Sequence, residues 1–377
     1  MKKIGILGGY GKVGSVAANH LARIDGIELL IAGRNERAAL NAAIELESNC
    51  ADESGKSFQG IGVDVHDPAS LAAFCEQCDI VLNCTGPTAL IGDVVARAAI
   101  LNGAHFVDPG GYDYVLDQLE DLRDKAAEKA LNICFAAGIV PGISASLPAL
   151  AAADFTEIYS MDCYFAGEDS WSYGSAYDMT CGMHELSQLG PCMICKGEER
   201  KLPFPERVIH FPSLPEPMGN SLAQPFYTKE FQRVCKGIGA DESRCFWVNT
   251  GPAFFLALGA VRLFKLYRSG SQIERSAKML CRASAMDGKR RPPKGYMLCT
   301  VIKGICDGIK ETKTYWLYFP DSYTGTGLAS GLMVQKIVEA PAEKSVMGFF
   351  PDMVKASDVL SVLENEGICL QVKAGGV

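Results

Sequence analysis

Three glycines follow the first apolar run of the chain in the pattern G-x-G-x-x-G, at Gly9, Gly11 and Gly14. The run itself, residues 4–7, is typical of a buried strand, and the residues after Gly14 have the apolar spacing of a helix. In such a strand–turn–helix one glycine permits the tight turn, one lets the backbone approach a pyrophosphate, and one lets the helix pack on the strand. The alternative is a glycine-rich turn that binds nothing. We expect a dinucleotide to contact Gly8, Gly9, Tyr10, Gly11, Lys12, Val13 and Gly14.

Short apolar runs alternate with helical stretches over the first 140 residues. This alternation predicts a parallel sheet covered by helices on both faces, and six strands make a full doubly wound dinucleotide fold. The expected strands are 4–7, 28–32, 60–65, 79–83, 104–107 and 132–136, and the expected helices are 36–46, 68–75, 92–101 and 114–130.

The pattern changes after residue 142. We expect a hairpin of strands 296–305 and 314–319 with Asp307-Gly308 as its turn, and a proline-rich loop over 203–225. The fold class we predict is α/β, a Rossmann doubly wound parallel sheet plus an inserted α+β substrate and dimerisation domain. The expected domains are 1–140 for the nucleotide, 141–325 for the substrate, and 326–377 as a C-terminal helical segment that returns to the Rossmann domain.

The end of the second expected strand indicates which dinucleotide binds. A NAD site has an acidic residue there for the ribose 2′-hydroxyl, whereas this chain has Arg34 and Asn35, with no carboxylate before Glu36. A guanidinium pairs with a 2′-phosphate, so the cofactor we predict is NADP(H). The later strand ends add the expected cofactor contacts Asp64, Val65, Cys84, Thr85, Gly86 and Pro87.

The net charge of −8 argues against nucleic acid as a partner, because phosphate backbones need a basic face. No secretory signal and no apolar run of membrane-spanning length are visible, so we expect a cytoplasmic protein without a membrane partner. The fifteen cysteines include two C-x-x-C pairs, but their separation is not that of a zinc ribbon. We therefore expect reduced thiols and no metal site.

Seven segments of the chain carry a resemblance to a known family: GGYGKVG at 8–14, AGRN at 32–35, NCTGP at 83–87, HFVDPGGYD at 105–113, AGIVPGIS at 137–144, TGLASGL at 326–332 and GFFPDM at 348–353. Together they resemble the saccharopine dehydrogenase-like (saccharopine reductase-type) NADP-dependent oxidoreductases. The resemblance implies the two-domain fold described above, a C-terminal helix that returns to the first domain, and a homodimer. Val140 departs from the family pattern, which commonly has Asp immediately before the proline that is Pro141 here, so saccharopine itself is not the expected substrate.

Hydride transfer also needs a group that supplies or removes a proton. The candidates are Asp108, Tyr112 and His184, while Arg233 and Arg244 are candidates for binding an acidic substrate group. The function we predict is an NADPH-dependent oxidoreductase that reduces a C=N (imine) or related C=X bond of an amino-acid-like or carrier-bound small molecule. Two alternatives stay open: a synthase that retains NAD(P) as a prosthetic group, and a non-enzymatic NADP-binding sensor or scaffold.

Overall fold

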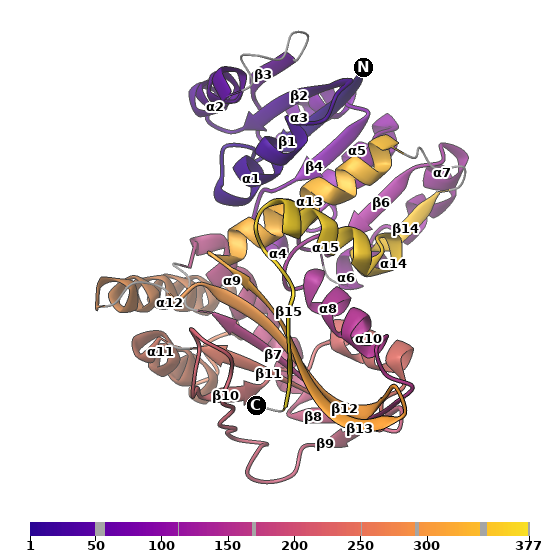
Figure 1. Ribbon diagram of the computed structural model, residues 1–377. Helices are drawn as coiled ribbons and strands as arrows, with labels where there is room; N and C mark the ends of the chain where they lie inside the picture. Colours follow the sequence, from indigo (N-terminus) through magenta and orange to yellow (C-terminus); the bar gives the residue numbers. More distant parts are fainter. Residues whose placement is uncertain are drawn as a thin grey trace. The chain divides into compact units, whose positions relative to one another are not determined.

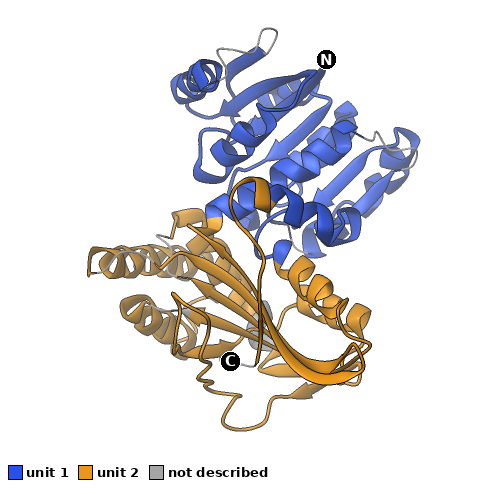
Figure 2. Cartoon of the chain, in the orientation of Figure 1, with its two compact units in different colours: residues 1–143, 323–362 blue, residues 144–322, 363–377 orange. Residues whose placement is uncertain are grey.

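The computed structural model describes residues 1–49, 57–111, 113–167, 171–249, 251–290, 294–339 and 345–375. These residues form two compact units, shown in blue and orange in Figure 2. The first unit comprises residues 1–143 and 323–362, and the second comprises residues 144–322 and 363–377. Each unit has its own sheet and is described by itself below.

The first unit alternates strands with helices from its first residues onward (Figure 1). Its elements are β1 (Lys2–Leu7), α1 (Lys12–Leu21), β2 (Ile27–Gly33), α2 (Glu36–Asn49), β3 (Ser57–Gly62), α3 (Pro68–Cys75), β4 (Ile80–Asn83), α4 (Thr88–Ile91), α5 (Val94–Asn102), β5 (His105–Val107), α6 (Asp113–Asp117), η1 (Glu120–Leu122), α7 (Arg123–Glu128), β6 (Asn132–Phe135), α13 (Ser322–Glu339), β14 (Val346–Phe349), α14 (Phe350–Met353) and the first part of α15 (Ala356–Asn365).

Within the described residues, the sheet of the first unit has the strand order β14-β6-β5-β4-β1-β2-β3, and every pair in it is parallel. The predicted doubly wound parallel sheet is therefore confirmed. The order reverses between β1 and β4, whose carboxyl ends lie side by side through the register pair Leu7 and Asn83. In sheets of this kind the ligand crevice opens at that reversal.

Both faces of this sheet are covered, which explains why its central strands are apolar throughout. On one face, Phe74 of α3 and Val95 of α5 pack in a cluster with Val81 and Phe106 of the strands. The helix α13 packs closely against α1 through small residues: a Cβ atom on Gly327 would lie 2.5 Å from Cβ of Val16. The glycine-rich segment at 326–332 therefore allows two helices to approach each other.

Two predicted elements of the first unit differ from those observed, and its strand β14 was not predicted. The third strand spans Ser57–Gly62 and ends opposite Gly33, the last residue of its partner β2; Asp64 lies beyond it, in a turn where it accepts a hydrogen bond from the backbone of His66. The helix expected over 114–130 is divided into α6, η1 and α7. Its break is fixed by Arg97 of α5, which donates to the Gln118 carbonyl oxygen at 2.7 Å. That oxygen would otherwise accept an intrahelical bond.

The second unit is an α+β arrangement (Figure 1). Its elements are α8 (Ile143–Ala152), β7 (Glu157–Gly167), α9 (Tyr173–Leu189), β8 (Cys192–Cys195), β9 (Glu198–Lys201), β10 (Ala223–Pro225), α10 (Lys229–Ile238), β11 (Glu242–Asn249), α11 (Pro252–Leu263), α12 (Gly270–Arg290), β12 (Tyr296–Cys306), β13 (Ile309–Phe319) and β15 (Gln371–Ala374).

Its sheet is mixed, with the order β15-β13-β12-β7-β11-β8-β9, and β10 pairs with β11. β11 runs parallel to β7, whereas β12 and β13 form the predicted antiparallel hairpin. The hairpin turn is Asp307-Gly308, and both residues have positive φ angles, of 51° and 77°. Such angles are those of a two-residue turn that matches the twist of the flanking strands.

The segment 203–225, predicted as a loop, ends in the short strand β10 (Ala223–Pro225), which pairs with β11, and the residues before it pack on the second sheet. Its Leu214 and Met218 join a buried cluster with Tyr164 of β7 and Phe246 of β11. The C-terminal segment is divided between the two units, in contrast to the expected return of 326–377 to the Rossmann domain. Residues 363–377 belong to the second unit because β15 pairs with β13.

Candidate cofactor site

The glycine loop after β1 is a cradle lined by backbone. Gly8 has a φ angle of 73° and donates its N–H to the carbonyl oxygen of Ala32 at 2.7 Å. A Cβ atom on Gly8 would lie 2.7 Å from the carbonyl oxygen of Cys84, and one on Gly14 would lie 2.3 Å from the carbonyl oxygen of Gly8. Neither position accommodates a side chain, so the loop exposes main-chain atoms.

This loop leads directly into α1. Gly11 is the N-cap residue and donates its N–H to the Gly8 carbonyl oxygen at 2.9 Å, but it offers no side chain to cap the helix. The first turn contains no acidic residue. The N–H groups of Lys12, Val13 and Gly14 are therefore positioned for an anion, where the helix dipole favours negative charge. These residues fit the diphosphate of a dinucleotide.

The side chain of Tyr10, a residue of the glycine loop, contacts the end of β2. A Cβ atom on Gly33 would lie 2.6 Å from the Tyr10 ring, and the Tyr10 hydroxyl accepts a hydrogen bond from the backbone N–H of Asn35 at 3.1 Å. The Asn35 side chain caps α2 by accepting from the N–H of Ala38 at 3.1 Å. Arg34, between the aromatic ring and the cap, is exposed. The end of β2 therefore presents a cation in place of an acidic residue.

The two expected contacts after β3 differ in exposure. Asp64 is exposed, and its carboxylate accepts from the N–H of His66 at 3.0 Å. Val65 is only 7% exposed and belongs to the apolar core of the unit. A side chain buried in this way has little surface left to offer a ligand.

The turn after β4 carries the other expected contacts. Cys84 and Thr85 are half-buried, and Gly86 is exposed. Cys84 donates its N–H to the Leu7 carbonyl oxygen at 2.8 Å, which brings this turn against the glycine loop. Burial, together with the nearby Asp108 charge, raises the pKa of the Cys84 thiol. The thiol is therefore uncharged near neutral pH.

The three proposed proton-transfer residues lie in different surroundings. Asp108 directly follows β5 and is 4% exposed, with its carboxylate bonded to Asn83 at 2.7 Å. His184 is an exposed residue of α9 in the second unit. Tyr112 lies outside the described residues. Asn83 was not among the expected site residues; the signal for it is a lone amide at the end of a buried apolar strand.

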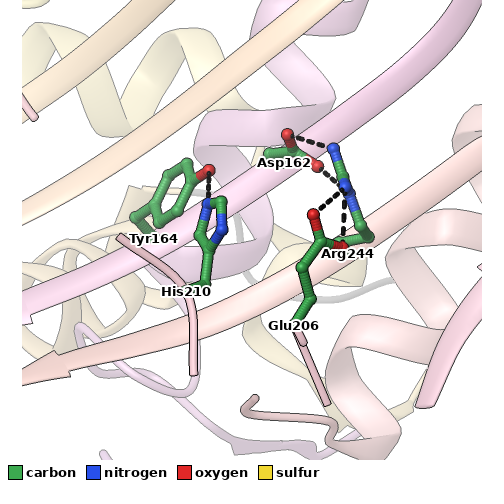
Figure 3. A network of polar contacts seen from close by, with 5 residues as sticks. All are labelled: Asp162, Tyr164, Glu206, His210 and Arg244. Carbon is green, nitrogen blue, oxygen red and sulfur yellow. Dashed lines mark hydrogen bonds and ion pairs between the residues drawn. The ribbon is translucent and has the colours of Figure 1, made fainter. Parts of the chain in front are cut away.

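Arg244, a candidate for binding an acidic substrate, instead belongs to a network of charges within the second unit (Figure 3). It donates to both oxygens of Asp162, at 2.6 and 2.7 Å, and to Glu206 at 3.1 and 3.0 Å. Burial opposes the charge of Arg244, but the two carboxylates outweigh it and raise its pKa. Beside the network, the Tyr164 hydroxyl and Nε2 of His210 are hydrogen bonded at 3.1 Å.

The strand order, the glycine cradle and the open end of α1 define a Rossmann-type dinucleotide-binding domain. Residues 4–134 match the family model of the saccharopine dehydrogenase NADP binding domain. This part of the chain is therefore similar to that NADP-binding family, as the resemblance drawn from the sequence predicts.

Two curated relatives have matching segments. The lipid droplet localized protein of Caenorhabditis elegans is 29% identical over 130 residues, which are 33% of this chain and 30% of that protein. The saccharopine dehydrogenase-like oxidoreductase of Homo sapiens is 37% identical over 76 residues, which are 20% of this chain and 18% of that protein. The matched segments therefore span less than a third of these relatives.

The fold of the whole chain also occurs in a solved structure. Apo saccharopine dehydrogenase (L-Glu forming) of Saccharomyces cerevisiae superposes with a TM-score of 0.66 and covers 100% of both chains at 16% identity. Among the helices of the described ranges, none has the length and apolar character required to cross a membrane. Within the same ranges, no group of three or more His, Cys, Asp or Glu residues is arranged to hold a metal ion.

Proposed function

We propose that this protein is an NADPH-dependent oxidoreductase that reduces a C=N or related C=X bond of an amino-acid-like or carrier-bound metabolite. The observation that carries the proposal is the backbone cradle at Gly8 and Gly14, which opens on an uncapped α1 beside the exposed Arg34. The family of the first unit supports NADP(H) as the ligand of this cradle. The names of the relatives support an oxidoreductase.

In this proposal, different residues bind different parts of NADP(H). The N–H groups at the start of α1 hold the diphosphate, and Arg34 binds the 2′-phosphate as a bidentate donor. The turn from Thr85 to Pro87 receives the nicotinamide end. The bound cofactor supplies the hydride. Tyr112 or His184 donates the proton.

The second unit binds the substrate and forms a homodimer in this proposal, and the protein is located in the cytoplasm. Light scattering of the purified chain tests the dimer, and cell fractionation tests the location.

Isothermal titration calorimetry with NADP⁺ and NAD⁺ tests the cofactor site. We expect Arg34→Ala to weaken NADP⁺ binding by about 10- to 100-fold, because charge-assisted bonds to a phosphate are lost, and to leave NAD⁺ binding unchanged. The control is Arg23→Ala, an exposed residue beyond the opposite end of α1, which should change neither affinity. An Arg34→Ala protein that keeps its preference for NADP⁺ would contradict the assignment.

Turnover tests separate the proposed enzyme from its alternatives. Cyclic imines, and pairs of an amino acid with a keto acid, should be reduced with stoichiometric loss of NADPH absorbance. A single burst of cofactor reduction without net consumption would favour a retained prosthetic group. Tight NADP(H) binding without any turnover across these substrates would favour a sensor.

A further inference from the structure

A chain of hydrogen bonds runs through the first unit beneath the turn after β4. Asp108 and Asn83 are 4% and 3% exposed; Asn83 ends β4, and Asp108 directly follows the neighbouring strand β5. One oxygen of Asp108 accepts from the N–H of Gly110 at 2.8 Å, and the other accepts from Nδ2 of Asn83 at 2.7 Å. The amide oxygen of Asn83 then accepts from the Thr85 backbone N–H at 3.2 Å and from the Thr85 hydroxyl at 2.5 Å.

We propose that Asp108 is a positioning residue that acts through Asn83 to fix the Thr85 hydroxyl and the turn that follows it. The proposal rests on the proposed function for one point, that the nicotinamide half of NADP(H) lies at this turn. It assigns Asp108 a role other than proton transfer. The physical basis is that a buried carboxylate bonded to two N–H donors has little access to a substrate.

The carboxylate of Asp108 determines which group donates and which accepts in each of these hydrogen bonds. An amide can turn over about its last torsion, which exchanges its donor and acceptor ends. Asp108 accepts, so it holds the NH₂ group of Asn83 toward itself and the amide oxygen toward Thr85. The Thr85 hydroxyl therefore donates its proton in a hydrogen bond to the amide oxygen of Asn83. Toward a ligand, this hydroxyl then offers only its lone pairs, which suit an N–H donor such as the carboxamide of nicotinamide.

An exchange of the two side chains tests this reasoning. In Asn83→Asp/Asp108→Asn, the amide at 108 can still accept from Gly110 and can donate to the carboxylate at 83, which still accepts from Thr85. The four hydrogen bonds that join Gly110, the side chains at 108 and 83, and Thr85 can all be kept, and the net charge is unchanged. In Asp108→Asn alone, the amide oxygen at 108 has to face the N–H of Gly110, so its NH₂ group faces the NH₂ group of Asn83. Asn83 then rotates its amide by half a turn and presents its NH₂ group, a donor, to Thr85. In Asn83→Asp alone, two carboxylates face each other.

The measurements are dissociation constants of the unloaded protein by calorimetry, together with its thermal unfolding. We expect Asp108→Asn to weaken NADP⁺ binding by about 5- to 30-fold, the loss of one to two buried hydrogen bonds. The exchanged pair should return to within about threefold of wild type. Adenosine 2′,5′-bisphosphate, which lacks the nicotinamide half, should bind all of these variants equally. If Asp108→Asn fails to fold, Thr85→Val should reproduce the selective loss of NADP⁺ affinity, and Thr85→Ser should retain that affinity.

The outcomes separate this inference from the proposed function. If the exchanged pair binds NADP⁺ as weakly as Asp108→Asn while both bind the bisphosphate normally, the positioning role is wrong and the charge at 108 is itself required. A Thr85→Val protein with unchanged NADP⁺ affinity would also overturn the positioning role. If wild type binds neither NADP⁺ nor the bisphosphate, the proposed function fails and this inference fails with it.

Discussion

Replacement of Arg244 by methionine measures how strongly the second unit depends on its network of charges. Arg244, Asp162 and Glu206 have side chains that are 18%, 11% and 22% exposed. Methionine fills the space of the arginine stem but leaves both carboxylates without a counter-charge. Loss of one partner of a buried ion pair costs about 3–5 kcal/mol, because the remaining charge stays desolvated. The partial exposure of Glu206 places the expected loss at about 3 kcal/mol.

Intrinsic fluorescence follows the second unit selectively, because all three tryptophans, Trp171, Trp247 and Trp316, lie in it. In a unit of about 190 residues, a loss of about 3 kcal/mol lowers the midpoint of thermal unfolding by roughly 6–12 °C. The control is Arg200→Met, because the Arg200–Glu198 pair is 3.8 Å apart with side chains 61% and 77% exposed. Such surface pairs contribute little, so the control midpoint should move by about 1 °C or less.

A second variant tests the cause of the loss. In Arg244→Met/Asp162→Asn/Glu206→Gln no uncompensated charge is buried, so we expect at least half of the lost stability to return. An Arg244→Met midpoint within about 2 °C of wild type would refute the reasoning, since the network would then contribute no more than an exposed pair. A triple variant less stable than Arg244→Met would show that the loss does not come from unpaired charge.

Two further predictions concern packing and pH. Gly327→Ala places a Cβ atom 2.5 Å from that of Val16, so the first unit should lose about 1–3 kcal/mol by calorimetry, whereas Gly348→Ala, with no atom within 4 Å of the new Cβ, should be neutral; equal midpoints would contradict the close packing of α13 on α1. Burial lowers the pKa of His210 against the opposing charges of Glu206 and Asp162, so the unfolded chain binds a proton first as the pH falls. The free energy of unfolding of the second unit should therefore decline below about pH 6.5, and it should decline less in His210→Gln. Equal urea-unfolding midpoints at pH 7 and pH 5.5 in the wild type would exclude this contribution.

The first unit was largely predictable because its signals are local. The glycine spacing after β1 and the alternation of apolar runs with helices each depend on a few neighbouring residues. The short strand β14 was not predicted, because its four residues become a strand only by pairing with β6, more than two hundred positions earlier. The helix expected over 114–130 is divided by Arg97, which lies outside that segment.

The sequence by itself determined the dinucleotide loop, the cation after the second strand and the Asp307-Gly308 turn, because each follows from the conformations available to a short stretch of chain. Only the tertiary structure decided which side chains meet. Asn83 and Asp108 are brought together by the parallel pairing of β4 and β5. Arg244 meets Asp162 and Glu206 because β11 lies beside β7, under the segment 203–225. No local pattern encodes these contacts, since they depend on which distant strands become neighbours.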